Sequence, residues 1–261
     1  MGQDFKSFKH QLREGVTLRL FSLGRIVHPL FVEMFARAGG YHGFWVDAEH
    51  SAPTPDQLFV ASLAARANQF DCFVRMPAIG YWAVTRVLEM GMGGVMASQI
   101  RSAEQAEQFL RWAKFPPVGE RGTILTGRDA DYSHKPVAQF CSDANRDTLV
   151  GIQIEALSAV EQVNDIAAID GVDLLFVGPT DLSVVLGIPG QFHDQKLWDA
   201  IGRVADACRR HGKNWGCVSP DPKFAERAVE NGCRMVTMGN DVLVIRRGID
   251  AFKNAFATRF E

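Results

Sequence analysis

Long apolar runs, targeting segments and paired cysteine motifs are absent from this chain of 261 residues. No apolar stretch has the length needed to span a bilayer, and the first residues lack the apolar core of a signal peptide. The formal net charge is −2, so no overall basic field would attract nucleic acid or an anionic membrane. These absences predict a cytoplasmic protein without nucleic-acid or membrane partners.

The five cysteines follow neither a disulfide pattern nor a metal-binding pattern. They are odd in number, scattered, and include no C-x-x-C motif: Cys72, Cys141, Cys208, Cys217 and Cys233. Free thiols in a reducing compartment explain this distribution best, and most of the five are expected to be small apolar core residues. A structural zinc site is therefore not expected.

Motifs for organic cofactors are missing as well. No G-x-G-x-x-G follows the first predicted strand, and no G-x-x-x-x-G-K-[ST] occurs. No lysine stands at the end of a predicted strand, because Lys114, Lys135 and Lys213 lie in predicted loops. These absences argue against a bound nucleotide and against Schiff-base chemistry on a lysine.

What the chain does contain is a regular alternation of apolar strand-like runs and helical segments. Strands are expected at 16–21, 43–47, 72–75, 94–98, 149–154, 174–177, 215–218 and 235–238. Helices are expected at 29–38, 82–90, 102–112, 157–169, 196–210, 222–230 and 241–256, and another opens at Thr54. Eight such units in about 250 residues are typical of a (β/α)₈ TIM barrel, an α/β fold. We therefore predict one barrel domain over 1–261, preceded by a short helix at 5–12.

The segment 115–147 is too long to be a plain connection. It is rich in proline, glycine and charge, and we expect a functional excursion there. Whether it covers the site of its own chain or of a neighbour stays open.

Polar side chains collect at the ends of the predicted strands, where barrel enzymes carry their chemistry. Glu155 and Asp181 follow neighbouring strands, and two carboxylates so placed are suited to a hard divalent cation. A lone histidine after a strand is more often structural than a base, and a buried arginine there is structural in about a third of cases, but here several polar groups converge on one face. The candidates are Asp47, Glu49, His50, Arg75, Ser98, Gln99, Gln153, Glu155, Thr180, Asp181 and Ser219.

Five segments resemble the motifs of one known family. They are Trp45-Val46-Asp47-Ala48-Glu49-His50, Val74-Arg75, 115–122 (FPPVGERG), Gln153-Ile154-Glu155 and 176–183 (FVGPTDLS). This set, in this order, is similar to the HpcH/HpaI aldolases, the class II pyruvate aldolases. The resemblance runs from about Phe21 to the C-terminal helix.

The resemblance implies a barrel that assembles into trimers or hexamers, with the last helix packing on a neighbouring subunit. It implies a divalent metal (Mg²⁺, Mn²⁺ or Co²⁺) held by Glu155 and Asp181, and no organic cofactor. The substrate implied is a 2-oxo acid such as pyruvate, cleaved from or joined to an aldehyde.

The chemistry of an enolate assigns expected roles to the other residues. Arg75 would stabilise charge on the keto oxygen, and His50 would act as general base through a water, with Asp47 orienting its imidazole. The amides of Thr180 and Asp181 would bind the substrate carboxylate if a short helix starts there. Glu49 would bind waters of the metal, and Gln153 and Ser219 complete the predicted substrate contacts.

Three departures from the family pattern concern the aldehyde partner. Glu89 replaces an aspartate that reaches into a neighbour's site, and Met96-Ala97-Ser98-Gln99 replaces a V-P-x-V segment. Arg19 takes the place nearest to a tryptophan of the first strand. It would either meet an anionic acceptor or pair with Glu49 or Asp47.

Three functions are compatible with these residues. The first is a metal-dependent aldolase acting on 4-hydroxy-2-oxo acids such as 2-oxo-3-deoxy sugar acids. The second is an acyl-CoA lyase related to the citrate lyase beta subunit, and the third is a homologue that binds 2-oxo acids without catalysis. The presence of His50, Arg75, Glu155 and Asp181 together favours the first.

Overall fold

Eight parallel strands close into a barrel in chain order, each hydrogen-bonded to the next and β8 to β1. The computed structural model describes residues 5–260, and the side chains up to residue 257. The barrel confirms the predicted (β/α)₈ fold. The strands are β1 Leu18–Leu23, β2 Gly43–Asp47, β3 Asp71–Pro77, β4 Gly94–Ser98, β5 Leu149–Ile154, β6 Leu174–Val177, β7 Asn214–Val218 and β8 Met235–Asn240.

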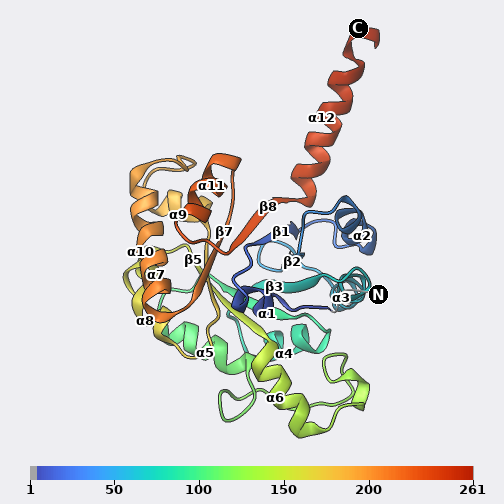
Figure 1. The fold of residues 1–261 in the computed structure, drawn as a ribbon, viewed down its shortest axis with the longest axis vertical. Helices are drawn as coiled ribbons and strands as arrows, with labels where there is room; N and C mark the ends of the chain where they lie inside the picture. Colours follow the sequence, from blue (N-terminus) through green and yellow to red (C-terminus); the bar gives the residue numbers. More distant parts are fainter. Residues whose placement is uncertain (1–4, 261) are drawn as a thin grey trace.

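Helices surround the barrel and return the chain from the carboxyl end of one strand to the start of the next (Figure 1). In α3, Thr54 and Gln57 form a reciprocal capping box ahead of Pro55 at the first helical position. The helices are α1 Phe8–Arg13, α2 Pro29–Ala38, α3 Pro55–Ala67, α4 Tyr81–Glu89, α5 Ala103–Ala113, the 3₁₀ turn η1 Asp131–Ser133, α6 Val137–Asp147, α7 Leu157–Glu161, α8 Val163–Ala168, α9 Pro179–Val185, α10 Gln195–His211, α11 Pro222–Glu230 and α12 Asp241–Phe260.

Two predicted segments differ from the structure. The excursion 115–147 contains a regular helix, α6, whose Phe140 packs with Phe115 and Ala130 in a small separate core. The predicted helix 157–169 is two short helices, α7 and α8, that meet at Gln162. Both differences lie outside the barrel strands, so the positions of the strand ends are unaffected.

Two apolar layers build the core. The larger one lies between the sheet and the surrounding helices, and the smaller one fills the barrel interior with side chains such as Trp45, Phe73, Met96 and Phe176. Helix α1 closes the floor of the barrel, where Phe8 and Leu12 are buried in the same interior cluster. Because strand residues alternate between the two layers, every second residue beyond the interior cluster points to the mouth.

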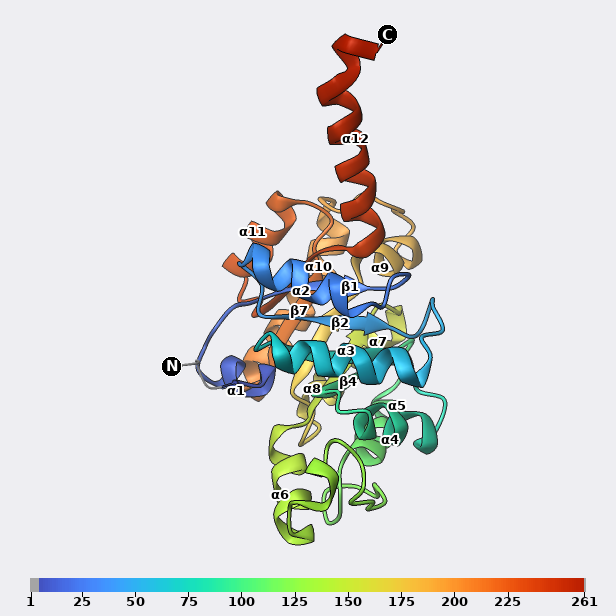
Figure 2. The same cartoon turned by 90° about the vertical axis from the view of Figure 1, so that its right-hand side faces the viewer.

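The two ends of the molecule carry different appendages. Helix α12 leaves the barrel mouth and projects away from it, whereas α6 lies at the opposite end (Figures 1 and 2). The five cysteines are free thiols, as predicted. In the described residues 5–260, no helix is both long and apolar enough to cross a membrane.

Candidate active site at the mouth of the barrel

A layer of polar side chains lies directly above the apolar interior. Trp45 of β2 is followed two residues later by Asp47, and Phe73 of β3 by Arg75. Met96 of β4 is followed in the same way by Ser98. Since side chains two residues apart share one face of a strand, these polar groups point into the mouth. This is the face on which we predicted the site.

Asp47 and Arg75 are neighbours in the sheet register and form a two-point ion pair. Arg75 Nη2 lies 2.8 Å from Asp47 Oδ2, and Arg75 Nε donates to Asp47 Oδ1 at 3.3 Å. Arg75 Nη1 lies 3.2 Å from Glu49 Oε2. Although burial alone would raise it, the guanidinium of Arg75 and nearby backbone amides hold the pKa of Asp47 below its usual value. A fixed positive group therefore stands in the mouth.

In this structure the carboxylate of Asp47 contacts the backbone of His50 and not its imidazole. Asp47 Oδ1 accepts the backbone N–H groups of Glu49 at 2.9 Å and of His50 at 3.2 Å, so it shapes the turn after β2. The carboxylate beside the imidazole is that of Glu49, with 3.8 Å between His50 Nε2 and Glu49 Oε2. The side chain of His50 is 58% exposed, which leaves the ring free to meet a ligand in the mouth.

Glu155 is a buried carboxylate at the end of β5, with only 2% of the residue exposed. Its Oε1 accepts the backbone N–H of Gln99 at 2.8 Å, and its Oε2 accepts the side-chain amide of Gln153. Burial, together with the nearby carboxylates of Glu49 and Asp181, raises the pKa of Glu155 to about 7. Gln99 adopts a left-handed backbone, φ 56°, which is unusual outside glycine and turns its amide toward Glu155.

Asp181 lies in the first turn of α9, directly after the turn that follows β6, as predicted. Among the described residues, no group of three or more His, Cys, Asp or Glu side chains is arranged to hold a metal ion. The candidate cation site is therefore the two-carboxylate pair of Glu155 and Asp181, which leaves coordination positions for a substrate and waters.

Gly178 keeps the space between the two carboxylate positions open. A Cβ atom on Gly178 would lie 2.6 Å from Gln153 Nε2 and 2.7 Å from Glu155 Oε2. Two buried polar atoms of the same region, Ser98 Oγ and Gln153 Oε1, have no hydrogen-bond partner among the described residues. Such atoms are costly in an apolar core, and their concentration here marks the part of the mouth that is built for a polar ligand.

The polar layer opens into a cavity of about 600 Å³, within the range of small-molecule sites. Six of the predicted site residues line this cavity: Asp47, His50, Arg75, Gln153, Thr180 and Asp181. Ser219 does not line it, because its hydroxyl donates to the carbonyl of Asp221 in the turn before α11.

The two remaining predicted positions lie elsewhere. Arg19 is the second residue of β1, near the barrel floor, and its backbone N–H donates to the imidazole of His42. The acidic groups that it could have paired with, Asp47 and Glu49, are ion-paired with Arg75 instead. Glu89 is the last residue of α4, on the same side of the barrel as Arg19. Burial raises the pKa of Glu89; the nearby Arg121 lowers it in part, and Asp129 raises it further. Glu89 is thus outside the mouth of its own chain.

Sequence reasoning missed three charged residues of the mouth. Arg25 follows β1, and Asp241 and Arg246 belong to α12; all three line the cavity. Arg25 could have been found from its place two residues beyond the end of a barrel strand. The role of Asp241 could not, because its partners are 215 to 217 residues away in the sequence.

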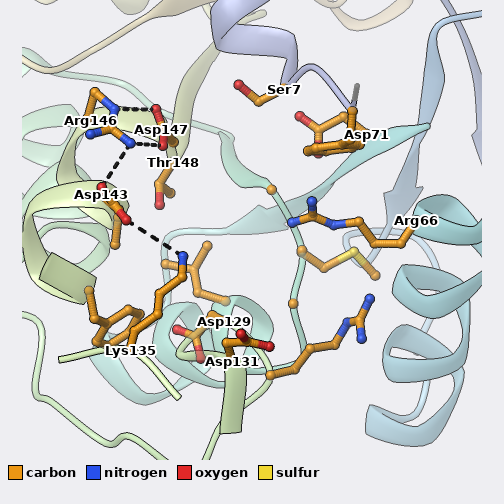
Figure 3. A pocket seen from close by; sticks show the side chains of 18 of the residues that line it. Ser7, Arg66, Asp71, Asp129, Asp131, Lys135, Asp143, Arg146, Asp147 and Thr148 are labelled. Carbon is orange, nitrogen blue, oxygen red and sulfur yellow. Dashed lines mark hydrogen bonds and ion pairs between the residues drawn. The ribbon is translucent and has the colours of Figure 1, made fainter. Parts of the chain in front are cut away.

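A second cavity, of about 860 Å³, lies at the barrel floor against the excursion 121–148. Figure 3 shows that Lys135 and Arg146 turn toward Asp143, with Arg146 also bound to Asp147. These charged side chains neutralise one another. Because chemistry in this fold sits at the opposite end of the strands, we assign the site to the mouth.

The fold and the mouth together define a barrel enzyme. A closed parallel barrel carries at its mouth a buried carboxylate with a second, half-buried carboxylate nearby, an ion-paired arginine and an exposed imidazole. That combination is suited to chemistry beside a carbonyl group.

Comparison with known proteins identifies the family. The model of the HpcH/HpaI aldolase/citrate lyase family matches residues 40–247, and the chain belongs to this family. A 4-hydroxy-2-oxovalerate aldolase of Novosphingobium aromaticivorans is 31% identical over 93% of this chain and 91% of its own. A 5-keto-4-deoxy-D-glucarate aldolase of Klebsiella pneumoniae is 29% identical over 88% of this chain and 89% of its own. The crystal structure of an HpcH/HpaI aldolase from Desulfitobacterium hafniense superposes with a TM-score of 0.87 at 31% identity, covering 95% of this chain and 96% of that one. The predicted resemblance and the aldolase and lyase class are confirmed.

Proposed function

We propose that this protein is a divalent-metal-dependent aldolase that cleaves 4-hydroxy-2-oxo acids to pyruvate, or a related 2-oxo acid, and an aldehyde. The observation that carries the proposal is the buried carboxylate Glu155, held beside Asp181 under the cavity. The family and its aldolase-named relatives support it. Among the residues that line the cavity there is no lysine, which argues against a Schiff-base mechanism.

The donor set fits a hard divalent cation. Glu155 and Asp181 would hold the ion, since carboxylate oxygens are its preferred ligands. Burial, together with the neighbouring carboxylates of Glu49 and Asp181, raises the pKa of Glu155, and a bound cation would favour the ionised carboxylate. When bound, the cation polarises the keto group of the 2-oxo acid. Gln153, whose amide is bound to Glu155, keeps the carboxylate oriented.

The chain's own residues perform the remaining steps. In the direction of condensation, a proton leaves the methyl carbon of the 2-oxo acid to His50 through an intervening water, and an enolate forms. Arg75 stabilises the negative charge on the keto oxygen, and the backbone amides of Thr180 and Asp181 bind the carboxylate. The enolate carbon attacks the aldehyde carbonyl, a carbon–carbon bond forms, and the aldehyde oxygen takes up a proton. Cleavage is the reverse, so no further reactant is needed.

Glu49 has a different role from the predicted one. Its carboxylate lies between Arg75 at 3.2 Å and the imidazole of His50 at 3.8 Å. We propose that it positions both groups and that waters of the metal are a lesser contact. This also replaces Asp47 as the group that orients the imidazole.

We further propose that the enzyme is a homo-oligomer. Helix α12 projects from the barrel and exposes large apolar side chains, including Ile249 at 62% and Phe252 at 71%. Apolar side chains presented in this way are typical of a surface that packs against another subunit.

The test is the exchange of the methyl protons of pyruvate with D₂O, followed by NMR. We expect exchange in the presence of Mg²⁺ or Mn²⁺, its loss with EDTA, and its recovery when excess Mn²⁺ is restored. Glu155→Gln and Asp181→Asn should remove it because each deletes one charged ligand. Exchange that is absent with every divalent metal, or turnover of acyl-CoA esters alone, would refute the aldolase proposal.

A further inference from the structure

Two arginines on the rim of the site cavity have no anionic partner. Arg25 follows β1 and Arg246 lies in the second turn of α12, and both line the cavity. Within the side chains that the structure describes, neither guanidinium forms an ion pair or a hydrogen bond. By contrast, Arg75 in the same cavity is ion-paired with both Asp47 and Glu49. The rim therefore carries two unpaired positive charges that an anionic ligand in the mouth could contact.

The backbone that carries Arg25 is held in place by α12. Asp241, of which only 1% is exposed, accepts the N–H groups of Gly24 at 3.0 Å, Arg25 at 2.7 Å and Ile26 at 2.6 Å through Oδ2. Hydrogen bonds from amides to a buried carboxylate are strong, so this loop is fixed against the start of α12. Arg25 and Arg246 are thus presented from two elements that one side chain ties together.

The cavity is larger than the enolate-forming half of the substrate requires. Its volume of about 600 Å³ is in the range of sites that hold much larger ligands than a three-carbon acid. The buried Arg75 and Gln153 and the carboxylate of Asp181 line its inner part, whereas the rim arginines belong to other elements, the β1–α2 loop and α12. The space between them is available for the aldehyde half.

We propose that Arg25 and Arg246 determine specificity by binding an anionic group on the aldehyde half of the substrate. This inference rests on the proposed aldolase function. The preferred acceptor is an aldehyde that carries a carboxylate or a phosphate, and the cleaved substrate is accordingly a 4-hydroxy-2-oxo acid with a second anionic group. The two arginines make no contact with the reacting carbon atoms, so they act on binding of the aldehyde.

The test compares charged and neutral aldehydes in condensation with pyruvate. Succinic semialdehyde is paired with butanal, and glyceraldehyde 3-phosphate with glyceraldehyde, so that carboxylate and phosphate are distinguished. Arg25→Gln and Arg246→Gln should each raise KM for the charged aldehyde about threefold to fivefold, as expected for a partly solvated ion pair. Arg25→Lys keeps the charge and should restore most of the lost affinity. Raising salt from about 0.05 M to about 0.5 M should raise the same KM and leave that for the neutral aldehyde unchanged.

The matched control is Arg247→Gln, an exposed arginine next to Arg246 that does not line the cavity. It should leave the discrimination between aldehydes as in the wild type. If the wild type exchanges pyruvate protons but treats charged and neutral aldehydes alike, the specificity proposal is wrong and the aldolase proposal stands. If the rim variants affect both kinds of aldehyde equally, it is also wrong. Absence of exchange in the wild type overturns both.

Discussion

Arg75 is the residue on which the most contacts of the site depend. Three of its nitrogens are used, one by Glu49 and two by Asp47, and its guanidinium carbon lies 5.0 Å from the centre of the Trp45 ring. A lysine has a single charged nitrogen and cannot serve two carboxylates in this planar geometry. The mouth therefore depends on the shape of this side chain as much as on its charge.

We expect Arg75→Lys to lower the rate of pyruvate proton exchange by roughly 100-fold, because a group that stabilises developing charge is displaced. Leaving one buried carboxylate unpaired should also cost about 2 kcal/mol of unfolding free energy. NMR exchange and urea unfolding measure the two effects. Arg86→Lys, on the exposed face of α4, is the control and should change neither. Wild-type exchange in Arg75→Lys would contradict the role of Arg75.

At Gly178, we expect one added methyl group to weaken metal binding without preventing folding. Its backbone, φ −94°, suits alanine, but the added Cβ would meet Gln153 and Glu155 at under 3 Å. We expect Gly178→Ala to fold normally and to bind Mn²⁺ about tenfold more weakly, since oriented ligands are essential to affinity. Calorimetric titration with Mn²⁺ tests this. Gly202→Ala, which has free space around it, should bind as the wild type does. Equal affinities would show that Glu155 is not held against Gly178.

At the scale of elements, helix α1 is joined to the barrel floor through a buried carboxylate. Asp71, at the start of β3, accepts the backbone N–H of Phe8 at 2.7 Å and that of Cys72 at 2.9 Å. Burial nevertheless raises the pKa of Asp71 to about 6. The carboxyl group therefore holds its proton more tightly in the folded protein than in the unfolded chain.

This shift predicts a pH dependence of stability. The contribution of a group with a raised pKa is complete below the unfolded pKa, near 4, and is lost as the pH rises through about 6. The unfolding free energy of the wild type relative to Asp71→Asn should fall by about 2 kcal/mol between pH 4 and pH 7. Urea unfolding of both proteins at the two pH values measures it. The other carboxylates titrate in both proteins, so their effects cancel when the two unfolding free energies are subtracted. A difference that stays the same at pH 4 and pH 7 would contradict the prediction.

The bounds of a strand or helix could be predicted from the sequence where the local pattern was unambiguous. The bounds of β2, β4, β5 and β6 agree with the predicted strands, because each is a short apolar run closed by turn residues. Helix α6 was missed although Val137, Phe140, Cys141 and Ala144 have helical spacing, since Pro136 and the surrounding charge pointed to a loop. Here the packing of Phe140 decided the structure, and packing partners are not visible in a local window.

The site was predictable as a set of strand ends and less so as a set of contacts. Alternation along a strand places Asp47 and Arg75 in the lining of the cavity, and Glu155 is buried at the end of β5. Which groups pair is decided by the register between strands, so the Asp47–Arg75 contact and the separation of Asp47 from the imidazole could not be read from either segment alone. The same applies to Asp241 and the loop after β1.

At the scale of the whole molecule, the exposed apolar side chains of α12 are the basis of the proposed assembly. We expect the wild type to be an oligomer by light scattering and Phe252→Glu to yield a smaller species, because burying a carboxylate in an apolar contact is costly. Lys253→Glu changes a neighbouring exposed side chain and should leave the molar mass unchanged. A wild type with the molar mass of one chain would refute the proposed assembly.

The chemistry of the mouth is divided between the two halves of the barrel. Strands β1 to β4 carry the ion-paired arginine and the turn with the imidazole, whereas β5 and β6 carry the buried carboxylate and the start of α9. Neither half of the chain contains both the proposed proton acceptor, His50, and the proposed cation ligands, Glu155 and Asp181. We therefore expect a partly folded intermediate with an open sheet to be inactive, and a metal–substrate complex to stabilise only the closed form. Turnover would therefore require that the strand pairs β4–β5 and β8–β1 have both formed.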